Sequence, residues 1–190
     1  FIQGPEVKSL EADLGKYLDD AHVIACANGT DALQIALMAL ELDPGDEVIV
    51  PSFTFVASVE VIALLGLKPI VVDVDPRSFL LKIEDIEASL SPRTKAIIPV
   101  HLFGQCVNMK ALMAIAKNRD LFVIEDNAQS IGARCIATGD AKEMSGTIGH
   151  IGCTSFYPSK NLGCYGDGGA MISRDEHLAH KIKMLANHGM

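Results

Sequence analysis

Short apolar runs alternate with helical patterns along the whole chain. Most of the runs are nearly continuous valine, isoleucine and leucine, which is typical of strands buried on both faces of a parallel sheet. We predict strands over seven ranges: His22–Cys26, Glu47–Val50, Pro69–Val72, Ala96–Val100, Leu121–Ile124, Gly152–Phe156 and Gly169–Ser173.

The segments between these runs have apolar residues at helical spacing. In the first of them, Leu33, Leu37 and Leu40 fall on one face. Alternation of this kind predicts an α/β domain with a mostly parallel seven-stranded sheet and helices on both faces. We predict helices over five ranges: Thr30–Leu42, Val56–Leu65, Ile83–Leu90, Met109–Asn118 and Glu176–Asn187.

The chain shows no internal repeat and no linker, so residues 1–190 are interpreted as one domain. Its longest irregular stretch, Arg134–Gly149, has glycines among polar residues and is expected to be a surface excursion. The chain opens on Phe1 rather than methionine and stops at Met190, straight after a helical pattern. We therefore expect a piece of a longer protein.

Composition and charge narrow the class of protein. Hydrophobic residues make up 49% of the 190 residues and charged residues 21%, which excludes a disordered chain. A formal net charge of −8 argues against a nucleic-acid partner, since phosphate backbones select clustered lysine and arginine. The apolar runs are too short to cross a bilayer, and early charged residues interrupt any signal peptide. We expect neither nucleic acid nor a membrane as a partner.

The cysteines indicate a reducing compartment. There are five of them, an odd number, and their spacing includes no C-x-x-C motif. Neither a disulfide framework nor a metal site is indicated. We expect five free thiols and a cytoplasmic location.

Candidate chemistry falls at the carboxyl ends of the predicted strands, where open α/β sheets bind ligands. The segment Cys26–Asp31 joins the first strand to a helix through small residues. Backbone N–H groups at that helix start can approach an anion. Asn28 or Thr30 can equally act as a plain N-cap, and the pattern leaves both interpretations open.

Two carboxylates, Glu125 and Asp126, come directly after another apolar strand. They point to opposite faces if the strand continues through them. One can then meet a buried ligand while the other meets solvent or a structural partner. The alternative is that both are turn or cap residues.

A third segment, Thr154–Gly163, passes from a strand end through a Pro-marked turn to Lys160, and a glycine-rich stretch follows to Gly169. Most lysines are ordinary surface residues. In an apolar, glycine-lined loop, however, a lysine can act as a nucleophile or imine former. Such a lysine, a buried acid and an anion cradle are together what pyridoxal phosphate requires.

These motifs resemble the sugar aminotransferases of the DegT/DnrJ/EryC/StrS family, which are fold-type I pyridoxal-phosphate enzymes. The resemblance covers essentially the whole chain and implies the cofactor-binding large domain, with the C-terminal small domain beyond Met190. Its matching stretches are Phe1–Val7, Ala27–Leu33, Pro44–Ile49, Pro92–His101, Glu125–Gln129 and Ser155–Gly169.

The resemblance implies roles for individual residues around the cofactor ring. Lys160 would form the Schiff base and move the proton. Asp126 would pair with the pyridine nitrogen, and Gln129 would lie near the phenolic oxygen. Phe55 would cover a face of the ring.

It also implies how the cofactor phosphate is held. Gly29, Thr30 and Asp31 would offer backbone or side-chain donors, and the hydroxyl of Ser155 would add another. In the family an asparagine of the partner subunit completes this site, which implies a homodimer with a shared active site.

Two features depart from the family pattern. Asn127 replaces a more usual alanine, and Ile136–Ser145 is the least familiar stretch. The nearest cations by sequence, Arg134 and Lys142, lie in or beside that stretch. We expect most contacts to a substrate's diphosphate and carboxylate to come from the part beyond Met190 or from the partner subunit.

The activity implied is transfer of an amino group from L-glutamate to a nucleotide-linked keto-sugar in surface polysaccharide biosynthesis. The stretches Cys26–Gln34, Phe103–Cys106 and Cys153–Gly169 are most similar to members that aminate a UDP-linked 3-keto-2-acetamido-glucuronic acid. Two alternatives are a dehydratase relative, which carries histidine in place of the lysine, and a non-catalytic regulatory or binding member. Lys160 argues against the first, and the intact set of Lys160, Asp126 and Ser155 argues against the second.

Overall fold

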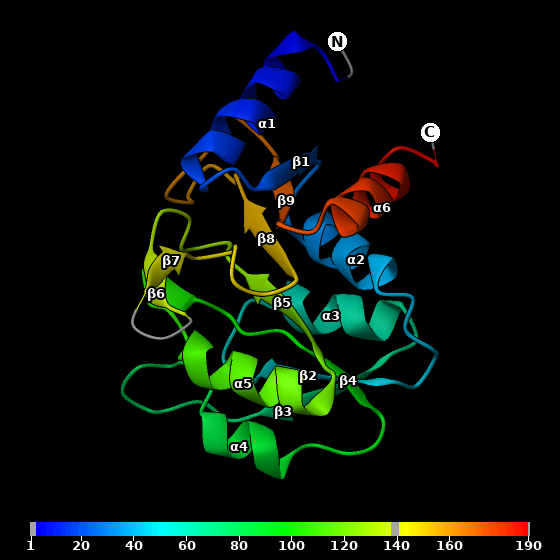
Figure 1. Ribbon diagram of the computed structural model, residues 1–190, viewed down its shortest axis with the longest axis vertical. Helices are drawn as coiled ribbons and strands as arrows, with labels where there is room; N and C mark the ends of the chain where they lie inside the picture. The colour runs from blue at the N-terminus through cyan, green and yellow to red at the C-terminus, as the bar shows by residue number, and fades with distance from the viewer. Residues whose placement is uncertain (1–2, 138–140, 190) are drawn as a thin grey trace.

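A seven-stranded sheet runs through the centre of the protein, in the order β1-β9-β8-β5-β4-β2-β3 (Figure 1). The computed structural model describes residues 3–137 and 141–189. Strands β3, β2, β4, β5 and β8 are parallel, and β9 is antiparallel to both of its neighbours. The prediction of a mostly parallel sheet is therefore confirmed. The strands are β1 His22–Cys26, β2 Glu47–Pro51, β3 Lys68–Val72, β4 Thr94–Ile97, β5 Phe122–Asp126, β8 Ile151–Ser155 and β9 Gly169–Ser173.

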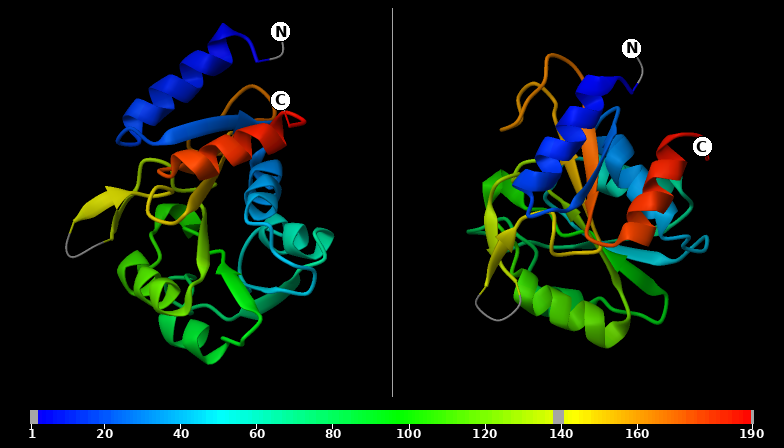
Figure 2. Two further views of the ribbon diagram at one scale, coloured as in Figure 1. Left: turned by 45° about the vertical axis from the view of Figure 1, so that its right-hand side comes forward. Right: turned by 45° about the horizontal axis from the view of Figure 1, so that its top comes forward.

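Helices cover both faces of the sheet, as predicted (Figure 2). Val48 and Val50 of β2 pack with α2, α3 and α6 on one face, and Ile49 between them packs with α5 on the other. Because both faces are buried, β2 is a continuous apolar run rather than an alternating one. The helices are α1 Pro5–Tyr17, α2 Gly29–Ala39, α3 Ala57–Leu64, α4 Ile83–Ala88, α5 Met109–Arg119 and α6 Glu176–Ala186, with a short 3-10 turn, η1, over Leu102–Gly104. None of the helices in the described ranges is long and apolar enough to span a membrane.

Most element boundaries differ by one to three residues from the sequence-based expectation, and one helix is absent from it. Strand β4 ends at Ile97 instead of Val100, because Pro99 has no N–H to continue the ladder. The N-terminal helix α1 is missing from the predicted elements, although Pro5 in its first turn is a start signal. It buries Leu14 and Leu18 beside β1 and β9.

The stretch Arg134–Gly149 is more than a surface excursion, which corrects the prediction for it. It contains a hairpin of β6 (Arg134–Ile136) and β7 (Lys142–Met144), and its last part turns back into the protein. Ser145 and Thr147 are 0% and 3% exposed. Residues 138–140 of the predicted excursion lie outside the described residues.

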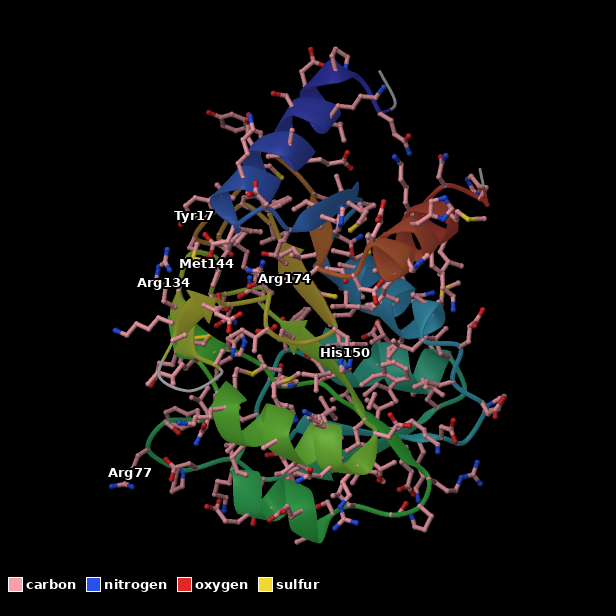
Figure 3. The ribbon with its side chains drawn as sticks, in the orientation of Figure 1. Tyr17, Arg77, Arg134, Met144, His150 and Arg174 are labelled. Atoms are coloured by element: carbon pink, nitrogen blue, oxygen red, sulfur yellow. A yellow bond between two sulfur atoms is a disulfide. The ribbon has the colours of Figure 1, made fainter. Side chains whose placement is uncertain are left out.

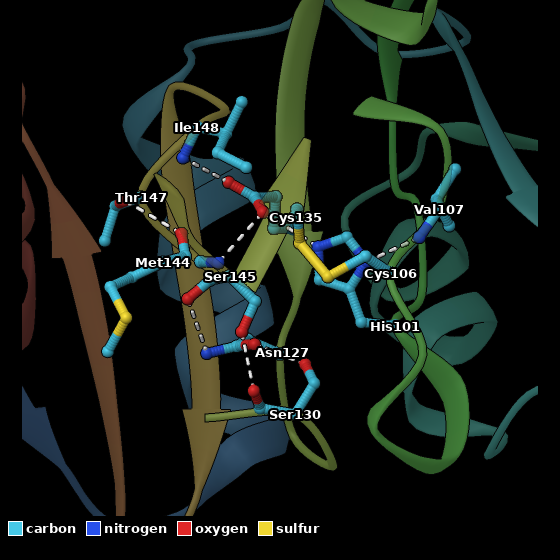
Figure 4. The surroundings of a disulfide bond; sticks show 12 residues. His101, Cys106, Val107, Asn127, Ser130, Cys135, Met144, Ser145, Thr147 and Ile148 are labelled. Atoms are coloured by element: carbon cyan, nitrogen blue, oxygen red, sulfur yellow. Dashed lines mark hydrogen bonds and ion pairs between the residues drawn. A yellow bond between two sulfur atoms is a disulfide. The ribbon is translucent and has the colours of Figure 1, made fainter. Parts of the chain in front are cut away.

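Two of the five cysteines form a disulfide, so the prediction of five free thiols is wrong for this pair (Figure 4). Cys106 and Cys135 are 29 positions apart in the sequence, and their Cα atoms are 5.4 Å apart in the fold. No local motif marks them, because only the packing of β6 against the segment after η1 brings them together. The free cysteines are Cys26, Cys153 and Cys164.

Candidate active site

A cavity of about 680 Å³ opens at the carboxyl ends of the central strands. The eight residues that sequence analysis assigns to the site come from four separate segments of the chain. All eight line this one cavity: Gly29, Thr30, Asp31, Phe55, Asp126, Gln129, Ser155 and Lys160. The fold therefore brings the predicted residues together at the place where a sheet of this type binds ligands.

The first turn of α2 forms one wall of the cavity. Asn28 is its N-cap: its Oδ1 accepts a hydrogen bond of 2.8 Å from the Asp31 N–H, and its Nδ2 donates to Asp31 Oδ2 at 3.1 Å. Gly29 and Thr30 head the helix, where backbone N–H groups have no acceptor within the helix. The segment is thus both a capped helix start and a positive end aimed at the cavity.

Close packing brings Ser155 against this helix start. A Cβ atom on Gly29 would lie 2.7 Å from Ser155 Cβ, and one on Gly169 would lie 2.5 Å from the Asn28 carbonyl oxygen. Only glycine permits these approaches. Ser155 Oγ accepts a 3.3 Å hydrogen bond from the Tyr157 N–H, which leaves its own hydrogen to be donated. Helix N–H groups and this hydroxyl make a site for a phosphate group.

Asp126 ends β5 and turns its carboxylate into the cavity, although the residue is only 6% exposed. Its Oδ2 accepts a 2.8 Å hydrogen bond from Ser58 Oγ, and its Oδ1 accepts one of 3.1 Å from the Ala128 N–H. Burial raises the pKa of this carboxyl, against the opposing effects of Ser58, Ala128 and the Lys160 charge. A carboxylate has about four acceptor positions. The remaining capacity of Asp126 suits a cationic N–H donor in the cavity.

Glu125 lies on the opposite face of β5, as the alternation of strand side chains predicts, and is fully buried. It accepts hydrogen bonds from His101 Nε2 at 2.8 Å and from the N–H groups of Gly146, Ile148 and Gly149 at 2.9, 2.7 and 2.5 Å. Burial alone would raise the pKa of Glu125, but these donors hold it below its ordinary value. Glu125 is therefore a structural anchor for the turn that follows β7.

The tautomer of His101 follows from its second contact. Its Nδ1 accepts a 3.2 Å hydrogen bond from the Val107 N–H, beside the disulfide shown in Figure 4. The ring hydrogen is therefore on Nε2 and is donated to Glu125. Sequence analysis includes His101 in a family motif but assigns it no function.

Asn127, which replaces the more usual alanine, also binds the segment after β7 (Figure 4). Its Nδ2 donates to the Ser145 carbonyl at 3.2 Å, and its Oδ1 accepts from Ser130 Oγ. The two departures from the family pattern are thus in contact with each other. None of the described residues of 134–149 lines the main cavity, and Figure 3 shows Arg134 on the outer side of the hairpin.

Lys160 lies in the tight turn after β8, where its N–H donates to the Tyr157 carbonyl at 2.8 Å. It lines the main cavity and also a smaller hollow of about 290 Å³ with Gln129 and Phe103. Gln129 Oε1 accepts a 2.9 Å hydrogen bond from the Phe103 N–H, so its Nε2 remains as a donor. The Phe55 side chain is 67% exposed at the mouth of the cavity. Of the described residues that line this cavity, Lys160 alone is cationic.

Ser58 contacts Asp126, and sequence analysis does not identify it as a site residue. It lies within the helix predicted over Val56–Leu65, and it is 0% exposed. The available signal is weak: a serine on an apolar helix face that also carries Val61 and Ile62. Its partner Asp126 is 68 positions away.

Comparison with known proteins agrees with the fold and the site. UDP-2-acetamido-2-deoxy-3-oxo-D-glucuronate aminotransferase of Pseudomonas aeruginosa is 52% identical over 189 residues, which is 100% of this chain and 51% of that protein. A crystal structure of a DegT DnrJ EryC1 StrS aminotransferase from Brucella abortus matches 97% of this chain and 50% of its own, with a TM-score of 0.91 and 51% identity.

A second similar structure is that of NtdA from Bacillus subtilis with its bound cofactor PMP. It matches 96% of this chain and 40% of its own, with a TM-score of 0.87 and 40% identity. The chain thus spans about half the length of the curated relative from Pseudomonas aeruginosa. Since residues 1–190 also match the family as a whole, the chain belongs to the DegT/DnrJ/EryC1/StrS aminotransferase family.

Proposed function

We propose that this cavity binds pyridoxal phosphate, and that the whole protein transfers an amino group from L-glutamate to a UDP-linked 3-keto sugar. The observation that carries the proposal is the convergence of an anion cradle, a buried carboxylate with spare acceptor capacity and a lysine on one cavity. Support for the cofactor also comes from the PMP bound in NtdA.

The residues present fit this cofactor. The N–H groups of Gly29 and Thr30 and the Ser155 hydroxyl would bind its phosphate, in a cradle that a Cβ atom on Gly29 would fill. Asp31 would keep the cradle in place through its two hydrogen bonds with Asn28, while its carboxylate, which only accepts hydrogen bonds, would not bind the phosphate itself. The donor set therefore matches a phosphate in charge and in hydrogen bonding.

Three further side chains would hold the ring. The Asp126 carboxylate would accept from the ring nitrogen. The free Nε2 of Gln129 would donate to the phenolic oxygen, and Phe55 would cover one face of the ring. All three of these groups already line the cavity, Phe55 from one segment of the chain and Asp126 and Gln129 from another.

When bound, pyridoxal phosphate supplies an electron sink for the carbon that loses its proton. Lys160 Nζ would attach the cofactor, leave when the amino donor enters, and then carry the proton away from the substrate carbon. The buried, ionised Asp126 would keep the ring nitrogen protonated, which is the state that withdraws electrons. Burial of Asp126 also excludes water, which strengthens this charge pair.

The substrate class rests on the Pseudomonas aeruginosa relative, whose name specifies a UDP-linked 3-oxo sugar acid. Such a substrate brings a diphosphate to a chain of net charge −8. Neither Arg134 nor Lys142 lines the cavity, and Figure 3 shows Arg134 on the outer side of the hairpin. Cations from the rest of the protein or from a partner subunit in a homodimer would therefore bind the diphosphate.

Two other parts of the proposal concern biology. Amino-sugar formation of this kind would serve surface polysaccharide biosynthesis. A cytoplasmic location stays a prediction, and the Cys106–Cys135 disulfide removes part of its basis.

The test is the ultraviolet-visible spectrum of the full-length protein with pyridoxal phosphate, before and after L-glutamate. We expect a protein-bound chromophore whose absorbance changes on adding glutamate and returns on adding a UDP-linked 3-keto sugar. A bound chromophore that does not respond to glutamate would indicate a non-catalytic member. Faster return with a 4-keto sugar would contradict the substrate class alone.

A further inference from the structure

We propose that Ser58 is a positioning residue for the cofactor: together with Thr54 it fixes the carboxylate of Asp126 in the orientation that receives the ring nitrogen. This inference rests on the proposed function and adds to it a residue that never touches the ligand. Ser58 does not line the cavity, whereas both Thr54 and Asp126 do.

Two hydrogen bonds connect Thr54 to Asp126 through Ser58. Thr54 and Asp126 lie at the cavity wall, and Ser58 lies behind it. Thr54 Oγ1 and Ser58 Oγ are 3.0 Å apart, and Ser58 Oγ is 2.8 Å from Asp126 Oδ2. An ionised carboxylate only accepts hydrogen bonds, so Ser58 donates to Asp126. The Ser58 oxygen is then free to accept the hydrogen of Thr54, and each bond polarises the next.

Ser58 is held firmly enough to orient its partner. Ser58 lies in the first turn of α3 and is 0% exposed, and its N–H donates to the Phe55 carbonyl at 3.2 Å. Asp126 meanwhile has one other donor from the protein, the Ala128 N–H on Oδ1. With one donor on each oxygen, the carboxylate cannot turn away from this orientation without losing hydrogen bonds.

The other ionisable groups near Asp126 do not replace this contact. Lys160 acts on it through charge. His101 is neutral, since its Nδ1 accepts from the Val107 N–H, and the Cys153 thiol is neutral too, since burial raises its pKa well above the ordinary value. Lys160 would be bonded to the cofactor in the resting enzyme, and His101 donates to Glu125 on the other face of β5. Loss of the Ser58 hydroxyl would therefore both free the carboxylate and make its ionised form less favourable.

The experiment compares the dissociation constant of pyridoxal phosphate, and its pH dependence, for the full-length wild type and for Ser58→Ala. We expect affinity at neutral pH to fall about ten-fold or more, the effect of one hydrogen bond to a charged group. We also expect the pH below which affinity is lost to move upward. Thr54→Val should change both in the same direction by a smaller amount.

The matched control is Ser173→Ala. Ser173 is equally buried at 2% exposure, but its Oγ donates to the His150 carbonyl at the other end of the sheet, at 2.9 Å. We expect this variant to keep the wild-type affinity and pH profile. A melting curve for each variant measures what the loss of a buried hydroxyl does to folding. Ser58→Cys, which keeps a weak donor in a small side chain, should give an intermediate affinity even if Ser58→Ala folds poorly.

The outcomes separate the two proposals. If the wild type binds the cofactor and Ser58→Ala binds it equally well with the same pH profile, the role of Ser58 is overturned and the proposed function stands. An equal loss of affinity in Ser173→Ala would also overturn it, since the effect would then be general. If the wild type does not bind pyridoxal phosphate at all, both proposals fall.

Discussion

Glu125 and Asp126 are neighbours on one strand and both are buried, yet their carboxylates differ in the number and kind of hydrogen-bond donors around them. Glu125 receives four donors, three of them backbone N–H groups, on the face of β5 that meets the turn after β7. Asp126 receives two, one of them a rotatable hydroxyl, on the face that meets the cavity. Correspondingly the pKa of Glu125 lies below its ordinary value and that of Asp126 lies above it.

The difference shows how a buried carboxylate can be assigned a role. Where the protein supplies every donor, the charge stabilises the fold. Where a buried carboxylate beside a cavity has unused acceptor positions, its charge is available to a ligand that enters the cavity. The folded state is then less stable than it would be with a neutral group at that position, a compromise typical of functional sites.

Removing the cationic side chain of Lys160, which lines the cavity, should have the largest effect on the reaction rate. We expect Lys160→Ala to lower the rate of the glutamate half-reaction by roughly 10⁴-fold or more, because both the attachment point and the proton carrier are lost. Absorbance in rapid mixing measures this rate. Lys142→Ala, at an exposed position of strand β7, is the control and should leave the rate unchanged. Borohydride reduction and peptide mapping of the wild type should place the pyridoxyl group on Lys160, and a label on Lys142 or Lys95 would refute the assignment.

The next effect tests Asp126 itself. We expect Asp126→Asn to slow the half-reaction by roughly 10²–10³-fold, the usual effect of removing one preorganised electrostatic group. The free energy of unfolding of the cofactor-free variant should be no lower than that of the wild type, since the Ser58 hydroxyl can rotate to accept a hydrogen bond from the new amide. A variant with a near-normal rate would show that Asp126 is structural and would make Glu125 the next candidate.

The converse substitution, Glu125→Gln, should act on the fold. The amide nitrogen must face an N–H donor that cannot rotate, so we expect the free energy of unfolding to fall by about 3 kcal/mol. Denaturant unfolding monitored by circular dichroism measures it. A variant as stable as the wild type would remove the contrast between the two carboxylates.

The smallest expected effect is on the pH dependence of stability. Its sign should differ between Glu125 and Asp126. Because the folded-state pKa of Glu125 is lowered, its contribution is full above its ordinary value of 4.5 and is lost as the pH falls through the folded value. Because that of Asp126 is raised, its carboxylate makes the folded state less stable as the pH rises through the raised value. Unfolding free energies of the cofactor-free wild type and both variants across this range give the two differences. Parallel curves would contradict the opposite shifts.

Sequence reasoning identifies the parts of the site that local chemistry marks. Lys160 is marked by a strand end and a glycine-rich turn, Asp126 by its place after a buried strand, and Gly29 by the small residues before a helix. The alternation of strand side chains also separates Glu125 from Asp126 correctly. The seven sheet strands follow from continuous apolar runs, which are typical of strands buried on both faces of a sheet.

What the sequence does not show are contacts between distant segments. Ser58 meets Asp126 across 68 positions, and Cys106 meets Cys135 across 29, with no periodic pattern to indicate either pair. The buried turn after β7 has the glycines and polar residues of a surface loop. It is buried because its N–H groups bind Glu125, and this becomes visible only when β5 and β8 are placed side by side.

The most direct test of the contrast is the ¹⁵N NMR shift of the ring nitrogen in labelled pyridoxal phosphate bound to the full-length protein. We predict a protonated nitrogen in the wild type and in Glu125→Gln, and an unprotonated one in Asp126→Asn. An unprotonated nitrogen in the wild type, or a protonated one in Asp126→Asn, would contradict the assignment of Asp126 as the carboxylate that serves the cofactor.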